Sequence, residues 1–318
     1  MKKIYTIILL LILILLAGLV FPWRQESQEG GKIENQKESK KVIKKDDKEA
    51  KILFVGDMMF DRYIRQVGNN KGEDFVFSCI GDFLRDSDLV VGNLEGPITE
   101  NASISMFTTP GGEGNYTFTF PTNTAKLLAK NNIRLVSLGN NHIYNFGEAG
   151  VASTKRYLTE AGVDYFGLPA NRESLVSQIE IKGNKISFIN YNEFGNIAVN
   201  DVVQKIEEEK QKDRIIIVYT HWGDEYVAPP QRVKNIAKKF ADNGADFIIG
   251  SHPHVILESE NINGAPVYYS LGNFIFDQYF NEEVSTGLVL ELNIKNGKIK
   301  TFEHKVLISR DGRTCLAD

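Results

Sequence analysis

The chain has 318 residues, of which 42% are hydrophobic and 25% charged, and its formal net charge is −4. This balance is typical of a globular protein, and the acidic excess gives no basis for a nucleic-acid partner, which a basic surface would bind. Because the only two cysteines, Cys79 and Cys315, lie far apart, neither a disulfide framework nor a cysteine metal site is expected, and the redox compartment stays open.

The first element is an uncharged apolar segment from Ile4 to Trp23, which follows two lysines. About 20 residues of helix are enough to cross a bilayer, so residues 1–23 are predicted to be a transmembrane anchor. A cleaved signal peptide is the alternative, although the segment is long for one and no clean cleavage site follows it. Both interpretations place the bulk of the protein outside the cytoplasmic membrane, and the anchor makes it a single-pass membrane protein.

Residues 24–49 are rich in Lys, Glu, Gln and Asp and contain almost no large apolar side chains. Such a segment buries too little apolar surface to offset the entropy of ordering it, so a disordered charged linker is predicted. The remaining residues, 50–318, are predicted to form one domain.

This domain alternates short β-branched segments with helical patterns. Each predicted strand is a continuous apolar run that ends in Gly, Asn, Asp or His, as expected for strands covered on both faces. The predicted strands are residues 51–57, 88–95, 133–141, 214–223, 245–252 and 266–274, and the predicted helices are residues 122–132, 147–161 and 229–243. The order of elements predicts a layered α/β domain with a central, partly mixed sheet flanked by helices.

Local signals predict where several elements begin or turn. Thr122 and Asn145 are candidate N-caps for the first two helices, because their side chains can accept hydrogen bonds from free backbone N–H groups. Two hairpins are predicted, with the positive φ angles of their tight turns at residues 183–184 and 296–297.

Polar side chains gather where the six predicted strands end, and four of the five histidines are among them. Because open α/β sheets bind ligands at the carboxyl ends of their strands, we expect these side chains to lie close together. The residues are Asp57, Asn93, Glu95, Asn140, Asn141, His142, His221, His252, His254, Asn273 and Asp277. Each alone is more typical of a turn or a structural hydrogen bond, but together these groups suit Mn²⁺, Zn²⁺ or Fe²⁺. A site for one or two divalent metal ions is therefore predicted.

The stretch His252-Pro253-His254 places two imidazoles one residue apart. Proline fixes its own φ and favours an extended backbone before it, so both histidines are expected on a stiff loop. They could contact neighbouring metal ions, with Glu95 as a bridge, in the two-metal arrangement known for attack on a phosphorus ester. His142 is then the candidate proton donor to the leaving oxygen.

Six segments of the chain resemble, in order, the CapA/PgsA family of poly-γ-glutamate capsule synthesis, whose domain has the calcineurin-like metallophosphoesterase fold. These segments are VGDMMFDR, VGNLEGPIT, GNNHIYNFGEAG, HWGDEY, GSHPHV and YSLGNFIFDQ. The resemblance implies metal ligands at Asp57, Glu95, Asn141, His221, His252 and His254, with His142 as the catalytic histidine. It also implies that Arg62 holds an anionic group of the substrate. The residues implied at the rim of the site, or in support of its ligands, are Glu225, Tyr226 and Asn273.

Three positions depart from the family pattern. The metallophosphoesterase superfamily has a histidine ligand where this chain has Met59, so Asn93 is a candidate to fill that place. Asn145 stands where the family usually has an aspartate, and Leu257 lies near the position of an expected glutamine. These departures make the contacts to substrate less defined than the fold.

Two functions fit these residues, both in the biosynthesis of a capsule or another cell-surface polymer. The first is a membrane-anchored, extracytoplasmic, metal-dependent hydrolase of a phosphoester or of an amide-linked polymer. The second is a non-catalytic subunit that holds an anionic polymer such as poly-γ-glutamate beside a membrane synthase. A structural domain with a relict site ranks last, because a core does not require polar residues at six strand ends.

Overall fold

The structure, a computed structural model, describes residues 49–317. The predicted anchor lies outside the described residues, and so does the predicted linker apart from Glu49. Between residues 49 and 317, no helix is long and apolar enough to cross a membrane. The described residues belong to one compact unit, Lys44–Asp318.

The first of two sheets is mixed and has eight strands. They are β1 (Ala50–Met58), β2 (Leu89–Leu94), β3 (Ile133–Ser137), β4 (Asp164–Phe166), β11 (Asn273–Ile275), β12 (Thr286–Lys295), β13 (Lys298–Ile308) and β14 (Thr314–Leu316). Their order is β14-β13-β12-β1-β2-β3-β4, and β11 also pairs with β1. Strands β1 to β4 and β11 run parallel, whereas β12, β13 and β14 form an antiparallel extension.

The second sheet is also mixed and has six strands. They are β5 (Val176–Ile181), β6 (Asn184–Asn192), β7 (Ile215–His221), β8 (Phe247–Ser251), β9 (Ser259–Ile262) and β10 (Ala265–Tyr268). Their order is β5-β6-β7-β8-β10-β9, with four parallel strands in the centre and an antiparallel strand at each edge.

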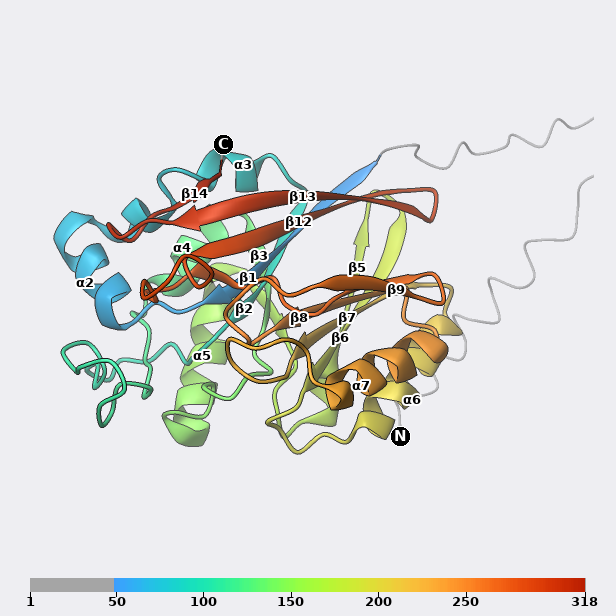
Figure 1. Ribbon diagram of the computed structural model, residues 1–318, viewed down its shortest axis with the longest axis horizontal. Helices are drawn as coiled ribbons and strands as arrows, with labels where there is room; N and C mark the ends of the chain where they lie inside the picture. Colours follow the sequence, from blue (N-terminus) through green and yellow to red (C-terminus); the bar gives the residue numbers. More distant parts are fainter. Residues whose placement is uncertain (1–48, 318) are drawn as a thin grey trace, which may run out of the picture. The chain divides into compact units, whose positions relative to one another are not determined.

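The two sheets pack face to face between two layers of helices (Figure 1). Helices α2 (Arg62–Lys71), α3 (Gly81–Arg85), α4 (Thr124–Lys130) and α5 (Gly147–Ala161) cover the first sheet; α6 (Val199–Lys210) and α7 (Gln231–Asp242) cover the second. Along β1, Leu53 and Val55 face the helices, whereas Ile52 and Phe54 face the other sheet. Both faces of the central strands are therefore buried, which explains their continuous apolar sequences.

The expectation of a layered α/β domain with mixed sheets and flanking helices is confirmed. The predicted strand 266–274 is wrong in one respect, because it divides into β10 in one sheet and β11 in the other. The chain crosses between the sheets at Gly272, which has a φ of 70°. Its carbonyl oxygen approaches Gly56 so closely that a Cβ at Gly56 would lie 1.8 Å from it, so a side chain there would prevent the crossing.

The predicted helix caps are wrong. Helix α4 begins after Asn123 and α5 after Phe146, and neither cap position has a side-chain cap hydrogen bond. Thr122 and Asn145 therefore do not occupy the cap positions. The Oδ1 atom of Asn145 instead accepts a hydrogen bond of 2.8 Å from the backbone N–H of Phe118.

The two predicted hairpins both form, but one turn lies a residue earlier than expected. In the β5–β6 hairpin the positive φ angles belong to Lys182 (48°) and Gly183 (77°) rather than to residues 183–184. The β12–β13 turn is confirmed, since Asn296 and Gly297 have φ angles of 52° and 75°.

A disulfide joins Cys79 and Cys315, which are 236 residues apart in the sequence. The expectation that the two cysteines do not support a disulfide is therefore wrong. The bond holds β14 against the segment that connects the 3-10 helix Glu73–Phe77 with α3. Only the folded chain brings the two residues together, so their sequence spacing carried no signal.

Candidate metal site

The carboxyl ends of the parallel strands bring the predicted site residues together. Asp57 at the end of β1 lies in register with Asn93 on β2 and with Asn273 on β11. The second sheet reaches the same point, because the backbone N–H of His252, just after β8, donates to Asp57 Oδ2 at 3.1 Å. The site therefore lies where the strand ends of both sheets meet, as the sequence predicted.

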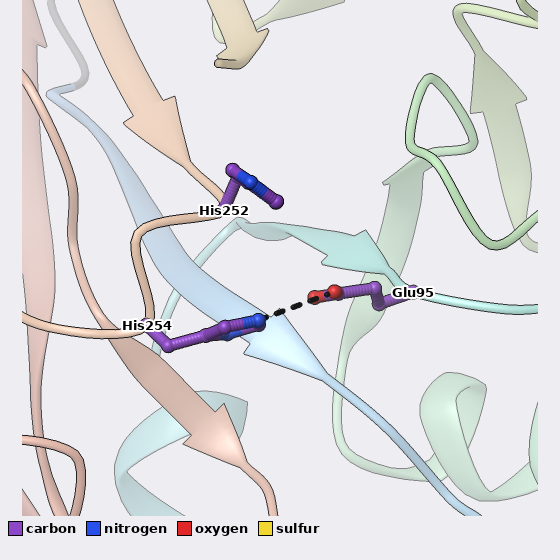
Figure 2. A group of neighbouring side chains, drawn as sticks. All are labelled: Glu95, His252 and His254. Atoms are coloured by element: carbon purple, nitrogen blue, oxygen red, sulfur yellow. Dashed lines mark ion pairs between the residues drawn. The ribbon is translucent and has the colours of Figure 1, made fainter. Parts of the chain in front are cut away.

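Glu95, His252 and His254 form a group that could hold a metal ion. One ligand atom from each lies within 4.8 Å of the others, and all three residues are buried. Figure 2 shows the carboxylate of Glu95 and the imidazole of His254 pointing toward one another, with His254 Nε2 3.6 Å from Glu95 Oε1. Imidazole nitrogen and carboxylate oxygen are donors that suit Mn²⁺, Zn²⁺ and Fe²⁺.

Within the described part of the chain, two buried atoms of this group have no hydrogen-bond partner, namely Glu95 Oε1 and His252 Nδ1. An unsatisfied buried polar atom costs about 1–3 kcal/mol, so such atoms are rare unless they have a function. A carboxylate oxygen and an imidazole nitrogen are both atoms that bind divalent cations. The residues present therefore fit a metal ion.

Hydrogen bonds to Asp57 hold its carboxylate in the charged form. The carboxylate accepts from Asn93 Nδ2 at 2.8 Å, and His254 Nδ1 lies 3.3 Å from it. Burial raises the pKa of Asp57, but His254, Asn93 and the backbone N–H of His252 more than offset it, so the pKa lies below its usual value.

The pKa of Glu95 shifts in the opposite direction, because the effects that raise it outweigh those that lower it. Burial raises its pKa well above the usual value, and the charges of Asp57 and Glu225 raise it further, whereas Arg62 lowers it. The pKa values of two carboxyl groups in one site are thus shifted in opposite directions. A bound cation would favour the charged form of Glu95, because it supplies the compensating charge that the protein lacks.

His221 and Asn141 lie together on one side of the group. The hydroxyl of Ser251 donates to Thr220 O at 2.7 Å, so its oxygen is free to accept from His221 Nδ1 at 3.1 Å. Asn93 Nδ2 lies 3.3 Å from the same Nδ1, and His221 Nε2 hydrogen-bonds Asn141 Oδ1 at 3.0 Å. An imidazole nitrogen and an amide oxygen, two atom types that can bind a divalent cation, thus lie together beside the group.

His142 lies beside the group, with Nε2 3.9 Å from Glu95 Oε1. Its Nδ1 contacts two oxygens, Tyr116 O at 3.1 Å and Asn145 Oδ1 at 3.2 Å. Because Nδ1 must donate to these acceptors, the lone pair of neutral His142 is on Nε2 and faces the site. Burial lowers the pKa of His142 to about 4. Asn145 thus orients the histidine with its amide oxygen.

Arg62 lies at the edge of the site, and its guanidinium group hydrogen-bonds Asn115 at 3.2 Å and pairs with Asp277. Its Cζ atom is 5.0 Å from the centre of the Phe118 ring. Because Arg62 acts electrostatically on both Glu95 and His142, its charge reaches the site.

The other predicted residues lie around this centre. Asn273 Oδ1 contacts His254 Nδ1 at 3.0 Å, which turns Nε2 of that imidazole toward Glu95. The ring of Tyr226 is 6.1 Å from that of His254, and Glu225 is exposed next to it. Met59 is buried, and its sulfur accepts from the backbone N–H of Asp61 at 3.0 Å.

Backbone strain is concentrated at this site. Four non-glycine residues at this site have positive φ angles: Arg62 (48°), Tyr226 (62°), His252 (97°) and His254 (59°). The extended backbone expected before Pro253 is therefore wrong for His252. Such conformations typically cost about 1–3 kcal/mol and cluster at functional sites.

Two further residues support the site: Asn140, which the sequence placed among the polar residues at the strand ends, and Phe194, which the sequence did not single out. Asn140 Nδ2 donates to Asn93 Oδ1 at 3.0 Å and to the Leu94 carbonyl at 2.8 Å, so it positions the end of β2. The ring of Phe194 lies 4.4 Å from that of His252. Asn140 has a sequence signal, since it ends a predicted strand, whereas nothing around Phe194 indicates its place.

Comparisons with known proteins agree over most of the chain. Residues 51–278 match the model of a family described as bacterial capsule synthesis protein PGA_cap. The PGA biosynthesis protein CapA of Bacillus subtilis is 30% identical over 280 residues, which cover 82% of this chain and 72% of that protein. The capsule biosynthesis protein CapA of Bacillus anthracis is 28% identical over 269 residues, which cover 78% of this chain and 65% of that protein.

A probable polyglutamine synthesis accessory protein of Mycobacterium tuberculosis is 25% identical over 283 residues, which cover 71% of this chain and 74% of that protein. The family match contains the whole candidate metal site, from Asp57 to Asn273. The chain therefore belongs to the bacterial capsule synthesis protein family.

Proposed function

We propose that this protein is a metal-dependent hydrolase of the metallophosphoesterase fold, which acts in the biosynthesis of poly-γ-glutamate or a related cell-surface polymer. The observation that carries the proposal is the group of Glu95, His252 and His254, in which two buried ligand atoms have no hydrogen-bond partner. The names of the relatives, which refer to PGA, capsule and polyglutamine synthesis, support the biological role.

Glu95, His252 and His254 would hold one divalent ion of Mn, Zn or Fe, and a second would use the remaining ligands. Those remaining ligands are Asp57, Asn141 and His221. A divalent ion supplies Lewis-acid activation of water and of the scissile phosphoryl or carbonyl oxygen. Because Met59 replaces a histidine ligand, we expect the second position to be the weaker one.

The chain's own residues handle charge and protons around this centre. His142 directs the lone pair of Nε2 toward the site, where Nε2 can accept a proton from the attacking water and then pass it to the leaving oxygen. Arg62 places a positive charge at the edge, where it can neutralise an anionic group of the substrate. The aromatic rings of Phe118 and Phe194 pack against the imidazoles of His142 and His252.

We further propose that the domain is extracytoplasmic and anchored by residues 1–23. The uncharged apolar segment supports the anchor. The disulfide between Cys79 and Cys315 supports an oxidising compartment, because such bonds are rare in the cytosol. Attachment of a cysteine-reactive, membrane-impermeant label to reduced intact cells tests this location.

Hydrolysis is tested with the full-length protein, loaded in turn with Mn²⁺, Zn²⁺ and Fe²⁺. The substrates are bis(p-nitrophenyl) phosphate and a γ-linked glutamate oligomer. We expect His142→Ala to retain metal and lose turnover, whereas His252→Ala loses both. Arg134→Ala serves as the control, because Arg134 is an exposed residue on β3 whose guanidinium contacts only Gly162 O. Turnover that survives in a metal-free His252→Ala protein would overturn the proposal.

A second candidate is a polymer-binding subunit of a membrane synthase complex that does not hydrolyse anything. A pocket of about 510 Å³ next to the site favours it, since the pocket offers a binding surface separate from the metal ligands. This function predicts that polymer binding or co-purification with a synthase persists in His142→Ala, while the wild-type protein turns over neither substrate.

A further inference from the structure

The pocket of about 510 Å³ opens beside the candidate metal site and shares residues with it. Arg62 and Tyr226 belong to both, and the carbonyl of Tyr116, another lining residue, contacts His142. Its walls come from α2, from residues 106–116, from Tyr226, from residues 277–280 and from Arg310. A ligand in the pocket would therefore reach the metal site directly.

Two buried donors at this pocket have no hydrogen-bond partner among residues 49–317. The hydroxyl of Tyr279 is buried without a hydrogen bond, and so is Nε of Arg62. Burial, and then the charge of Asp277, raises the pKa of Tyr279, so its hydroxyl stays protonated and able to donate. Unsatisfied buried donors are unfavourable unless a ligand supplies an acceptor.

The charged residues of the pocket lining leave a positive excess. Two arginines, Arg62 and Arg310, line it together with one acidic residue, Asp277, which is already paired with Arg62. Arg310 is exposed, and its Nη2 donates to Tyr279 O at 2.9 Å, which holds the guanidinium group at the wall. Guanidinium groups bind carboxylates with paired hydrogen bonds.

Aromatic rings around the pocket remain open to solvent. The exposed fractions are 38% for Tyr63, 54% for Tyr116, 38% for Tyr226 and 65% for Phe280. Exposed aromatic rings gathered around one pocket are typical of a ligand site rather than of a core. Their flat faces suit the methylene groups, amide planes or sugar rings of a polymer backbone.

We propose that this pocket is a binding subsite for a carboxylate-bearing segment of a chain polymer, with Arg310 and Arg62 as carboxylate partners and Tyr279 as a hydrogen-bond donor. The inference deepens the proposed function, on which it rests. Because the family match ends at residue 278, Tyr279, Phe280 and Arg310 lie beyond it.

The test is calorimetric titration of the full-length protein after removal of metal with a chelator. The probes are γ-linked tetraglutamate, its uncharged carboxamide analogue, and a tetrasaccharide of alternating glucuronate and N-acetylglucosamine. We expect one of the two acidic probes to bind, with the carboxamide analogue at least about tenfold weaker, as is typical of charged hydrogen bonds. Whichever acidic probe binds identifies the source of the carboxylate.

Two variants probe the named residues. Arg310→Gln should weaken binding at least about tenfold, whereas the control Arg134→Gln should not change it. Tyr279→Phe should weaken binding by about 3- to 10-fold without loss of folded stability, because the hydroxyl has no partner in the free protein.

Equal binding of the carboxamide analogue, an unaffected Arg310→Gln variant, or no binding of either acidic probe would overturn the inference. Since the titration requires neither metal nor turnover, these outcomes leave the hydrolase proposal intact. Conversely, failure to hydrolyse any substrate does not affect the titration.

Discussion

Asp61 and Glu95 both have side chains with no exposed surface, but they differ in how well their carboxyl oxygens are hydrogen-bonded. Asp61 accepts hydrogen bonds from Arg65 Nε at 2.8 Å, Ser103 Oγ at 2.6 Å, Ser105 Oγ at 2.9 Å and Thr119 N at 2.8 Å. Glu95 Oε2 accepts from Asn93 Nδ2 at 3.3 Å, whereas Glu95 Oε1 has no hydrogen-bond partner among the described residues. A buried charge that the chain satisfies stabilises a loop, whereas one that it leaves unsatisfied indicates a place for a cation.

The largest expected effect is on the satisfied carboxylate. Asp61→Ala removes four hydrogen bonds and leaves Arg65 without its carboxylate, so the free energy of unfolding should fall by about 3–5 kcal/mol. Urea denaturation, followed by circular dichroism, measures it. A loss below about 1 kcal/mol, typical of an exposed pair, would mean that Asp61 does not hold the 103–119 segment to α2.

Like Asp61, the disulfide is expected to contribute to stability rather than to metal binding. Replacing Cys79 and Cys315 together by serine should lower the free energy of unfolding by about 2–5 kcal/mol, because the unfolded chain regains its freedom. We expect the metal affinity of the folded variant to match that of wild type, since the bond lies on the α3 side of the first sheet. A parallel loss of metal affinity would contradict this separation.

Replacement of Glu95, the carboxylate that lacks partners, should weaken metal binding without lowering stability. Glu95→Gln removes a metal ligand, so metal affinity should fall by at least about 100-fold, more than supporting residues usually contribute. Thermal unfolding of the metal-free variant should occur at the same temperature as wild type or higher, because a costly buried carboxyl is gone. A marked destabilisation without metal would assign Glu95 a structural role instead.

The smallest expected effect concerns a residue that only positions others. Asn140→Ala removes the hydrogen bonds to Asn93 and to the Leu94 carbonyl, so metal affinity should fall by about tenfold. Asn235→Ala is the matched control, because Asn235 is an exposed asparagine on α7. Isothermal titration with Mn²⁺ or Zn²⁺ distinguishes the two, and equal affinities would remove Asn140 from the site.

The positions of most strands, and the gathering of polar side chains at their carboxyl ends, could be predicted from the sequence. Strands buried on both faces are continuously apolar, and a rule of sheet topology places ligands at their carboxyl ends. Asp57, Glu95 and the histidines of β7 and β8 could therefore be assigned to one place before the fold was known. The two sheets and the strand division at Gly272 were not predictable, because they depend on a close backbone approach to Gly56.

Two of the features that escaped prediction depend on contacts between distant segments. The hydrogen bonds of Asp61 connect residues up to 58 positions apart, and the disulfide connects residues 236 apart. Local composition carries no information about such pairs. The turn at Lys182 was missed for a different reason, since lysine rarely adopts a positive φ and the flanking strand register overrides that preference.

The metal content of the full-length protein tests the central claim most directly. The protein is purified without a histidine tag, dialysed against Mn²⁺, Fe²⁺ or Zn²⁺ and then against buffer, and its metal is counted by elemental mass spectrometry beside His252→Ala. We predict one to two equivalents of one of these metals in wild type and loss of at least one equivalent in the variant, with unchanged circular dichroism. Folded wild-type protein that retains none of the three metals in stoichiometric amount would contradict the account.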